Sequence, residues 1–147
     1  VGSEMCIRDR AGIESQAMAN VHQARWHKLV WNVPFNGLSV LLGTGTSAMM
    51  ADESSRELIQ ALMTEVVKGA HACGHEIPGS YVEQMLTMTD TMADYLPSMY
   101  HDHVHKRPLE LAAIYARPLA AAKAAGCELP RMQALYQALS FIDRRNR

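Results

Sequence analysis

The stretch WHKLVWNVPFN, residues 26–36, places Lys28, Asn32 and Asn36 four residues apart in a largely apolar run. On a helix this spacing puts the three side chains on one ridge about 12 Å long. A lysine supplies a positive charge and a proton, and an asparagine amide both donates and accepts hydrogen bonds. Together these groups suit a small substrate that carries a carbonyl, a hydroxyl and a carboxylate.

The same three residues could instead lie on a solvated helix face that has no chemical role. Trp26 and Trp31 flank the ridge and favour burial of this helix. A buried amide without a hydrogen-bond partner costs about 1–3 kcal/mol, so buried asparagines are expected to have partners. The spacing alone does not choose between a site and a solvated face.

Histidines offer a second candidate chemistry, because His71 and His75 are four residues apart and three more lie in HDHVH at 101–105. Zinc sites use such sets. However, Gly74 is expected to end a helix before His75, and the alternation in HDHVH would spread its imidazoles around a helix. We therefore predict no metal site, and a metal-binding helical protein is the weakest alternative function.

Composition indicates one ordinary globular domain of 147 residues, with 48% hydrophobic and 20% charged residues. The formal net charge is −1, from 14 basic and 15 acidic residues, which gives no reason to expect nucleic acid or a membrane as a partner. Three cysteines without a CxxC pair favour free thiols in a reducing compartment. We therefore expect a cytoplasmic protein.

Apolar residues recur at the helical period and no segment alternates like a strand, so the predicted fold class is all-α. Pro34 should kink the first long helix, because it removes one backbone hydrogen bond. Six of the ten methionines are interpreted as core residues: Met49, Met50, Met63, Met85, Met88 and Met92. We predict a connector over residues 11–18, helices over residues 19–42, 53–73, 81–95, 109–117 and 118–125, a short helix before Pro108, and a last helix from Pro130.

The segment KLVWNVPFN, followed about 60 residues later by PSMYHD and then by Glu110, resembles the C-terminal domain of ketopantoate reductases (2-dehydropantoate 2-reductases). AGI before the long helix, LMTEV in the second helix and AGCELP near the end extend the resemblance from about Ala11 to Leu139. It implies a helical bundle similar to the C-terminal domain of 6-phosphogluconate dehydrogenase. It also implies an N-terminal Rossmann domain that binds NADPH, and the GxGxxG of such a domain is missing here.

The resemblance implies a role for each matching residue. Lys28 matches the catalytic lysine, which acts as general acid on the ketone oxygen. Asn32 and Asn36 match asparagines that orient the substrate, and Ser98 matches the serine that binds its carboxylate. Glu110 matches a glutamate that contacts Lys28 and a substrate hydroxyl.

Thr46 and Tyr95 occupy places where further asparagines would be expected in the pantothenate-pathway enzyme. The substrate could therefore be a related small 2-oxo acid rather than ketopantoate. A different class of function also stays open, namely a helical dimerisation or small-ligand-binding domain without catalysis. A homodimer is compatible with both classes.

The opening VGSEMCIRDR resembles a translated sequencing-adapter scar. We therefore expect residues 1–10 to be foreign to the protein and residues 11–147 to form the helical substrate-binding domain. The cofactor domain would then be missing from the N-terminal side, and the chain by itself is expected to be inactive.

Overall fold

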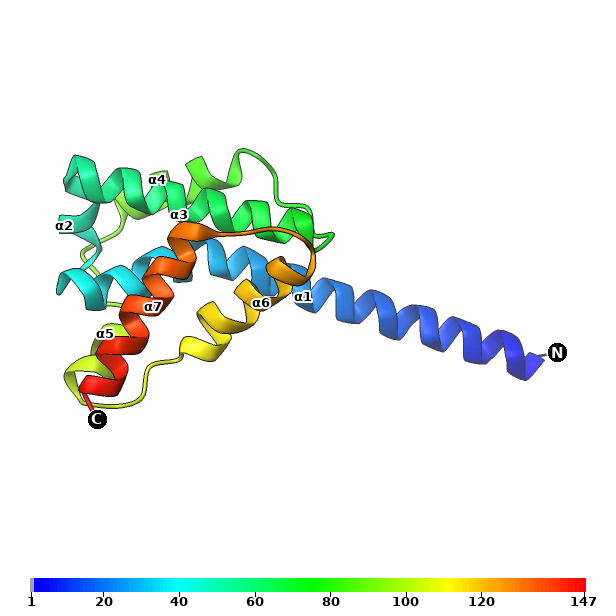
Figure 1. The fold of residues 1–147 in the computed structure, drawn as a ribbon. Helices are drawn as coiled ribbons and strands as arrows, with labels where there is room; N and C mark the ends of the chain where they lie inside the picture. Colours follow the sequence, from blue (N-terminus) through cyan, green and yellow to red (C-terminus); the bar gives the residue numbers. More distant parts are fainter. Residues whose placement is uncertain (1) are drawn as a thin grey trace.

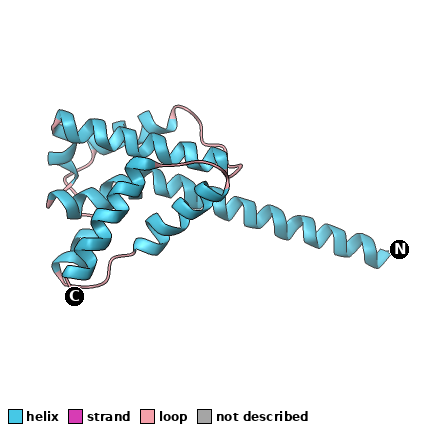
Figure 2. Ribbon diagram, viewed as in Figure 1, coloured by secondary structure: helices cyan, strands magenta, loops and turns pink. Residues whose placement is uncertain are grey.

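The structure is a computed structural model that describes residues 2–147, with side chains described for Ile13 and for residues 16–147. This part of the chain is helical and contains no strand, which confirms the all-α prediction (Figures 1 and 2). The elements are α1 (Gly2–Leu42), α2 (Thr46–Ala51), α3 (Glu53–Ala72), α4 (Tyr81–Thr91), α5 (Ser98–Val104), the π-helix η1 (Ala112–Ala116), α6 (Arg117–Ala124) and α7 (Pro130–Arg145).

Helix α1 is the longest element, and its N-terminal half extends away from the other helices (Figure 1). The predicted connector over residues 11–18 is wrong, because α1 includes these residues. Residues 13–33 contain neither glycine nor proline, so nothing in this stretch ends a helix. Three of its large apolar side chains are exposed: Ile13, Met18 and Val21.

The C-terminal half of α1 crosses the centre of the molecule, where Val30, Val33 and Phe35 are fully buried. Pro34 lies inside the helix and cannot donate to the carbonyl of Val30. In Figure 1 the ribbon of α1 changes direction as it passes from blue to cyan. This bend fits the predicted effect of an internal proline.

Helix α3 packs along α1 with one apolar face, as its period predicts. Its buried acid, Glu65, accepts hydrogen bonds from the backbone N–H groups of Arg131 and Met132, both at 3.0 Å. These N–H groups belong to the first turn of α7, where they have no partner within their own helix. Glu65 therefore caps α7 from another element, which fixes α7 against α3.

Helix α4 differs from its prediction, because it ends at Thr91 rather than near Tyr95. The backbone N–H of Thr46 donates to the Tyr95 carbonyl (3.0 Å), and the Tyr95 N–H donates to the Thr46 hydroxyl (3.2 Å). This pairing holds Tyr95 in an extended segment beside α2, a short helix that we did not predict. Met88 lies on the outer face of α4 and is 43% exposed, so its assignment to the core is wrong, whereas Met49, Met50 and Met63 are buried as predicted.

The π-helix η1 leads directly into α6, where two separate helical pieces were predicted. The backbone N–H of Arg117 donates to the carbonyl of Ala112, five residues earlier. In an α-helix Pro118 would meet the carbonyl of Ile114 and leave it without a donor. The wider π turn directly before Pro118 accommodates this conflict, and such turns often lie at functional sites.

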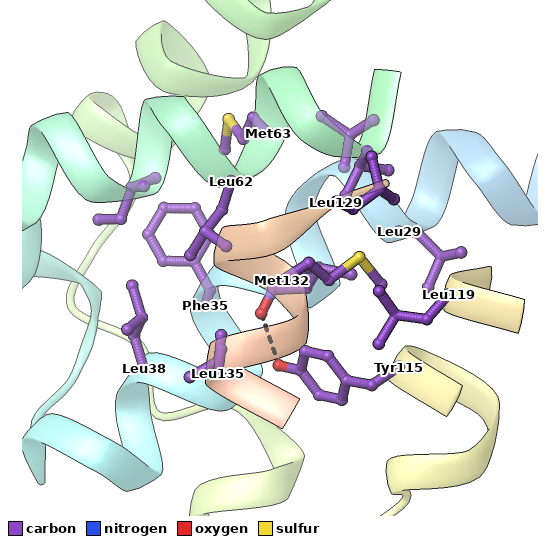
Figure 3. Close-up of a cluster of buried hydrophobic side chains, with 14 of the residues drawn as sticks. Leu29, Phe35, Leu38, Leu62, Met63, Tyr115, Leu119, Leu129, Met132 and Leu135 are labelled. Carbon is purple, nitrogen blue, oxygen red and sulfur yellow. Dashed lines mark hydrogen bonds between the residues drawn. The ribbon is translucent and has the colours of Figure 1, made fainter. Parts of the chain in front are cut away.

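Tyr115 of η1 is fully buried and joins η1 to α1 (Figure 3). Its hydroxyl donates to the carbonyl of Val33 at 2.6 Å, one residue before Pro34. Gly37 allows this close approach, because a Cβ there would overlap the Tyr115 hydroxyl and lie 2.9 Å from side-chain carbons of Leu135 and Leu139. A glycine is therefore required where α1, η1 and α7 meet.

Gly37→Ala should destabilise the protein, because the added methyl group has no space. We expect a loss of about 1–3 kcal/mol in the free energy of unfolding, the usual range for overpacking. Gly79→Ala is the matched control, because a Cβ at Gly79 meets nothing within 4 Å, and its effect should stay within about 0.5 kcal/mol. Urea denaturation of both variants checks this, and equal effects would contradict the packing role of Gly37.

Burial raises the pKa of the Tyr115 hydroxyl well above its ordinary value, which is about 10. The folded protein then keeps this proton while the unfolded chain loses it above about pH 10. The stabilisation from neutral Tyr115 is thus complete below about pH 10 and declines as the pH rises further.

In Tyr115→Phe we expect the free energy of unfolding to fall by about 0.5–1.5 kcal/mol at neutral pH, because the hydrogen bond to Val33 is missing. We also expect a shallower alkaline decline than in the unchanged protein. Urea denaturation between pH 8 and about pH 11.5 measures both effects.

Candidate active-site groove

A groove of about 610 Å³ runs between α1 and the wall formed by η1 and α6. Trp26 and Leu29 of α1 form an apolar part of its lining. Its polar groups come from α1, from α5 and from the wall on the opposite side. All five residues singled out in the sequence line it. The lining residues are His22, Arg25, Trp26, Lys28, Leu29, Asn32, Asn36, Ser98, Glu110, Ala113, Ile114, Arg117, Pro118 and Ala121.

The five residues reach the groove from three segments of the chain. Lys28, Asn32 and Asn36 come from successive turns of α1, Ser98 is the first residue of α5, and Glu110 lies just before η1. Lys28, Ser98 and Glu110 are exposed, Asn32 is half-buried, and Asn36 is only 4% exposed. The ridge on α1 therefore faces other polar groups across a shared concave surface, rather than open solvent alone.

Asn36 joins the polar groups of the groove to one another. Its Oδ1 accepts hydrogen bonds from the backbone N–H of Met99 at 3.2 Å and from the Ser98 hydroxyl at 3.4 Å. Its Nδ2 donates to the Oδ1 of Asn32 at 3.4 Å. The buried amide thus has partners, as expected from the cost of burying it. Because its donors and acceptors are used within the protein, Asn36 sets the positions of Ser98 and Asn32.

Asn32 has its carbonyl oxygen occupied by Asn36, which leaves its amide NH2 as the group that can donate to a ligand. The ammonium of Lys28 and the carboxylate of Glu110 line the same groove. None of the four ion pairs formed between side chains of described residues joins these two groups within 4 Å. In this conformation the groove offers a proton donor and an acceptor to a ligand without a direct bond between them.

Asp143, near the end of α7, fixes the segment that carries Glu110. It is only 7% exposed, and its Oδ1 accepts from the buried backbone N–H of Leu109 at 3.1 Å. Its Oδ2 accepts from the guanidinium of Arg147 at 2.8 Å. Sequence reasoning missed Asp143. The available signal was an acid in the last turns of a helix, where the helix dipole disfavours negative charge.

Several other candidate groups lie outside the groove. Thr46 and Tyr95 pair with each other and are not among the lining residues. His71 Nε2 accepts from the backbone N–H of Ile77 at 3.2 Å and serves a loop. Among the described side chains, no cluster of three or more histidine, cysteine, aspartate or glutamate residues could hold a metal ion.

Cys73 and Cys127 are free thiols, and burial raises the pKa of Cys73. The side chain of Cys6 lies outside the described residues. Within residues 2–147, no helix has both the length and the apolar character needed to cross a membrane.

Comparison with known proteins identifies the fold and the family. The family model described as "Ketopantoate reductase PanE/ApbA C terminal" matches residues 20–143. A 2-dehydropantoate 2-reductase from Nostoc sp. is 44% identical over 137 residues, which cover 93% of this chain and 43% of that protein.

Solved structures agree with this match. The crystal structure of 2-dehydropantoate 2-reductase from Geobacter metallireducens has a TM-score of 0.79 and 41% identity, and covers 86% of this chain and 42% of its own. The enzyme of the same name from Methylococcus capsulatus has a TM-score of 0.81 and 30% identity, with 86% and 40% covered. The chain thus spans less than half the length of these relatives.

The fold and the groove define a helical C-terminal domain of the 6-phosphogluconate dehydrogenase-like class. The relatives that share this domain are oxidoreductases. The chain belongs to the ketopantoate reductase family and is its C-terminal domain.

Asp143→Ala should destabilise the protein by about 1–3 kcal/mol, because the buried N–H of Leu109 loses its acceptor. Asp90→Ala is the matched control. It removes an aspartate that pairs with Arg56 in an exposed ion pair, and such pairs contribute about 0–1 kcal/mol. Chemical denaturation compares the free energies of unfolding of the two variants. Similar losses would show that the contact with Leu109 contributes no more than an exposed ion pair.

Proposed function

We propose that this domain forms the substrate-binding part of an NADPH-dependent reductase that converts 2-dehydropantoate to pantoate. The observation that carries this proposal is the meeting of Lys28, Asn32, Ser98 and Glu110 in one groove. The relatives from Nostoc sp. and Geobacter metallireducens are named 2-dehydropantoate 2-reductase, which supports the choice of substrate. A related 2-oxo acid is the nearest alternative, since Thr46 and Tyr95 stand where further asparagines would be expected.

In this proposal the substrate carboxylate accepts from the hydroxyl of Ser98. That hydroxyl makes only a long hydrogen bond of 3.4 Å to Asn36. If it rotates to donate to the substrate carboxylate instead, it gives up a weak hydrogen bond and gains a stronger one to a charged acceptor. The free NH2 of Asn32 donates to a second oxygen of the substrate. Asn36 acts behind both groups and keeps them at a fixed separation.

Lys28 is the general acid of the proposed reaction. The reduced nicotinamide, when bound, supplies a hydride to the ketone carbon. Negative charge then grows on the ketone oxygen, and the Lys28 ammonium stabilises it and delivers the proton that completes the alcohol. Glu110 accepts a hydrogen bond from the substrate hydroxyl and partly balances the positive charge of Lys28.

The cofactor is proposed to bind mainly to a preceding Rossmann domain, because residues 11–147 contain no GxGxxG motif. Residues 1–10 belong to neither domain in this proposal. We also place the enzyme in the cytoplasm, in line with its free thiols. The 147-residue chain should therefore not oxidise NADPH by itself, and turnover by the purified chain would contradict this division of labour.

A second candidate function is suggested by Ile13, Met18 and Val21, whose apolar side chains are exposed on α1. They favour a further packing partner, either the rest of a longer protein or a second copy of the chain. A domain that only dimerises would show a stable dimer by sedimentation and no reductase activity in the full-length protein. A homodimeric reductase would show both.

Lys28→Ala tests the catalytic role in the full-length enzyme, rebuilt with its own upstream sequence or with the corresponding part of the Nostoc relative. We expect kcat/KM for 2-dehydropantoate to fall by about 10²–10⁴-fold, the usual contribution of a positioned general acid. Lys123→Ala is the control, because Lys123 is exposed and lies outside the groove, and it should leave turnover unchanged. Near-normal turnover in Lys28→Ala would remove Lys28 from this role.

A further inference from the structure

The outer part of the groove carries positive charge that the proposed reaction does not use. His22 and Arg25 precede Lys28 on the groove-lining face of α1, and Arg117 begins α6 on the opposite wall. Glu110 is the one carboxylate among the lining residues. The whole chain has a net charge of −1, so this excess of cations is local to the groove.

No acid lies within helical reach of these arginines. The residues three and four positions from Arg25 are Val21, His22, Lys28 and Leu29, and those around Arg117 are alanines and an isoleucine. Like charges at such spacings destabilise a helix by a few tenths of a kcal/mol. The arrangement on α1 therefore has a small cost and no local compensation.

Four other arginines of the described chain are paired with acids, whereas Arg144 and Arg145 at the exposed end of α7 are not. The shortest of these pairs join Arg56 to Asp90 at 2.6 Å, Arg147 to Asp143 at 2.8 Å and Arg107 to Asp102 at 3.0 Å. Neither Arg25 nor Arg117 forms an ion pair with a described side chain. Their guanidinium groups are exposed in a concave surface and remain available to a ligand.

The groove is also longer than a small 2-oxo acid. His22 and Asn36 both line it, and 14 residues of α-helix span about 21 Å. The inner polar part, from Lys28 to Asn36, accounts for about 12 Å of this length. A ligand bound at Asn32 and Ser98 therefore leaves the part beside Arg25 free for another group.

We propose that Arg25 and Arg117 form an oxyanion-binding subsite in the outer part of the groove. Guanidinium groups bind phosphate and carboxylate through two parallel hydrogen bonds. The oxyanion has two sources, a phosphate of an extended ligand such as a dinucleotide, or a second carboxylate on the 2-oxo acid. The subsite deepens the proposed function and relies on it for the ligand of the inner part, but binding alone tests it.

The test is isothermal titration calorimetry on the 147-residue chain at low ionic strength, with inorganic pyrophosphate, 2-oxoglutarate and 2-oxobutanoate as separate probes. Arg25→Gln and Arg117→Gln should each weaken binding of the responsible oxyanion by about tenfold or more, as expected for loss of a charged hydrogen-bond pair. Arg144→Gln is the matched control, since Arg144 is exposed on α7 outside the groove. Circular dichroism checks that each variant is folded. Arg25→Lys and Arg117→Lys keep the positive charge but lose the planar guanidinium group that makes two parallel hydrogen bonds.

The probes separate the two sources. Pyrophosphate binding that depends on both arginines, with equal affinity for the two 2-oxo acids, assigns the subsite to a phosphate. A preference of about tenfold or more for 2-oxoglutarate over 2-oxobutanoate, lost in Arg25→Gln, assigns it to a second carboxylate. Absence of binding by every probe, or equal effects of all three glutamine variants, overturns the subsite.

Failure here is distinguishable from failure of the proposed function. Turnover of 2-dehydropantoate that depends on Lys28, together with unchanged titrations in the arginine variants, removes only the subsite. Oxyanion binding that depends on the arginines, in a full-length enzyme that does not reduce 2-dehydropantoate, keeps the subsite and removes the proposed substrate.

Discussion

The amide of Asn36 is the interaction on which the polar end of the groove depends. It is buried, and it connects α1 to the first turn of α5 and to Asn32 at the same time. Removing this amide would leave the N–H of Met99 without an acceptor in a buried setting, at a cost of about 1–3 kcal/mol. It would also release Ser98 from α1. One side chain therefore couples the stability of the fold to the arrangement of the groups that face a ligand.

The same division between buried supports and exposed acting groups holds on the opposite wall. Tyr115 ties η1 to α1, and Asp143 holds the backbone next to Glu110. Both supporting side chains are buried, so water does not compete for their hydrogen bonds. Lys28 and Glu110, in contrast, are exposed and retain their hydration until a ligand displaces it. The rigidity of the site lies in its supports rather than in its acting residues.

The helical period was enough to predict the fold class and the ridge of Lys28, Asn32 and Asn36, because both depend on local spacing. Ser98 and Glu110 required the family resemblance, since nothing in their neighbourhood distinguishes them from a helix cap and a surface acid. Their position beside the ridge depends on the tertiary fold and not on local sequence.

The misses have related physical causes. Glu65 and Asp143 bind backbone N–H groups that are 66 and 34 residues away in the sequence. No local sequence pattern indicates such distant partners. Helix α4 was predicted too long because the pairing of Tyr95 with Thr46 outweighs the helical propensity of the intervening residues. The helix over residues 11–18 was missed for the opposite reason, since local propensity alone supports it and no core contact was needed.

The uninterrupted outer half of α1 has a mechanical consequence. Lys28 sits on the same straight segment as Ile13, Met18 and Val21, and the first proline of that segment is Pro34, beyond the lysine. Between the exposed end and Lys28, Trp26 is buried in the core, as are Leu29 and Val30 directly after the lysine. Attachment of another body at the exposed end would therefore anchor the domain while the packed turns keep the ammonium in place.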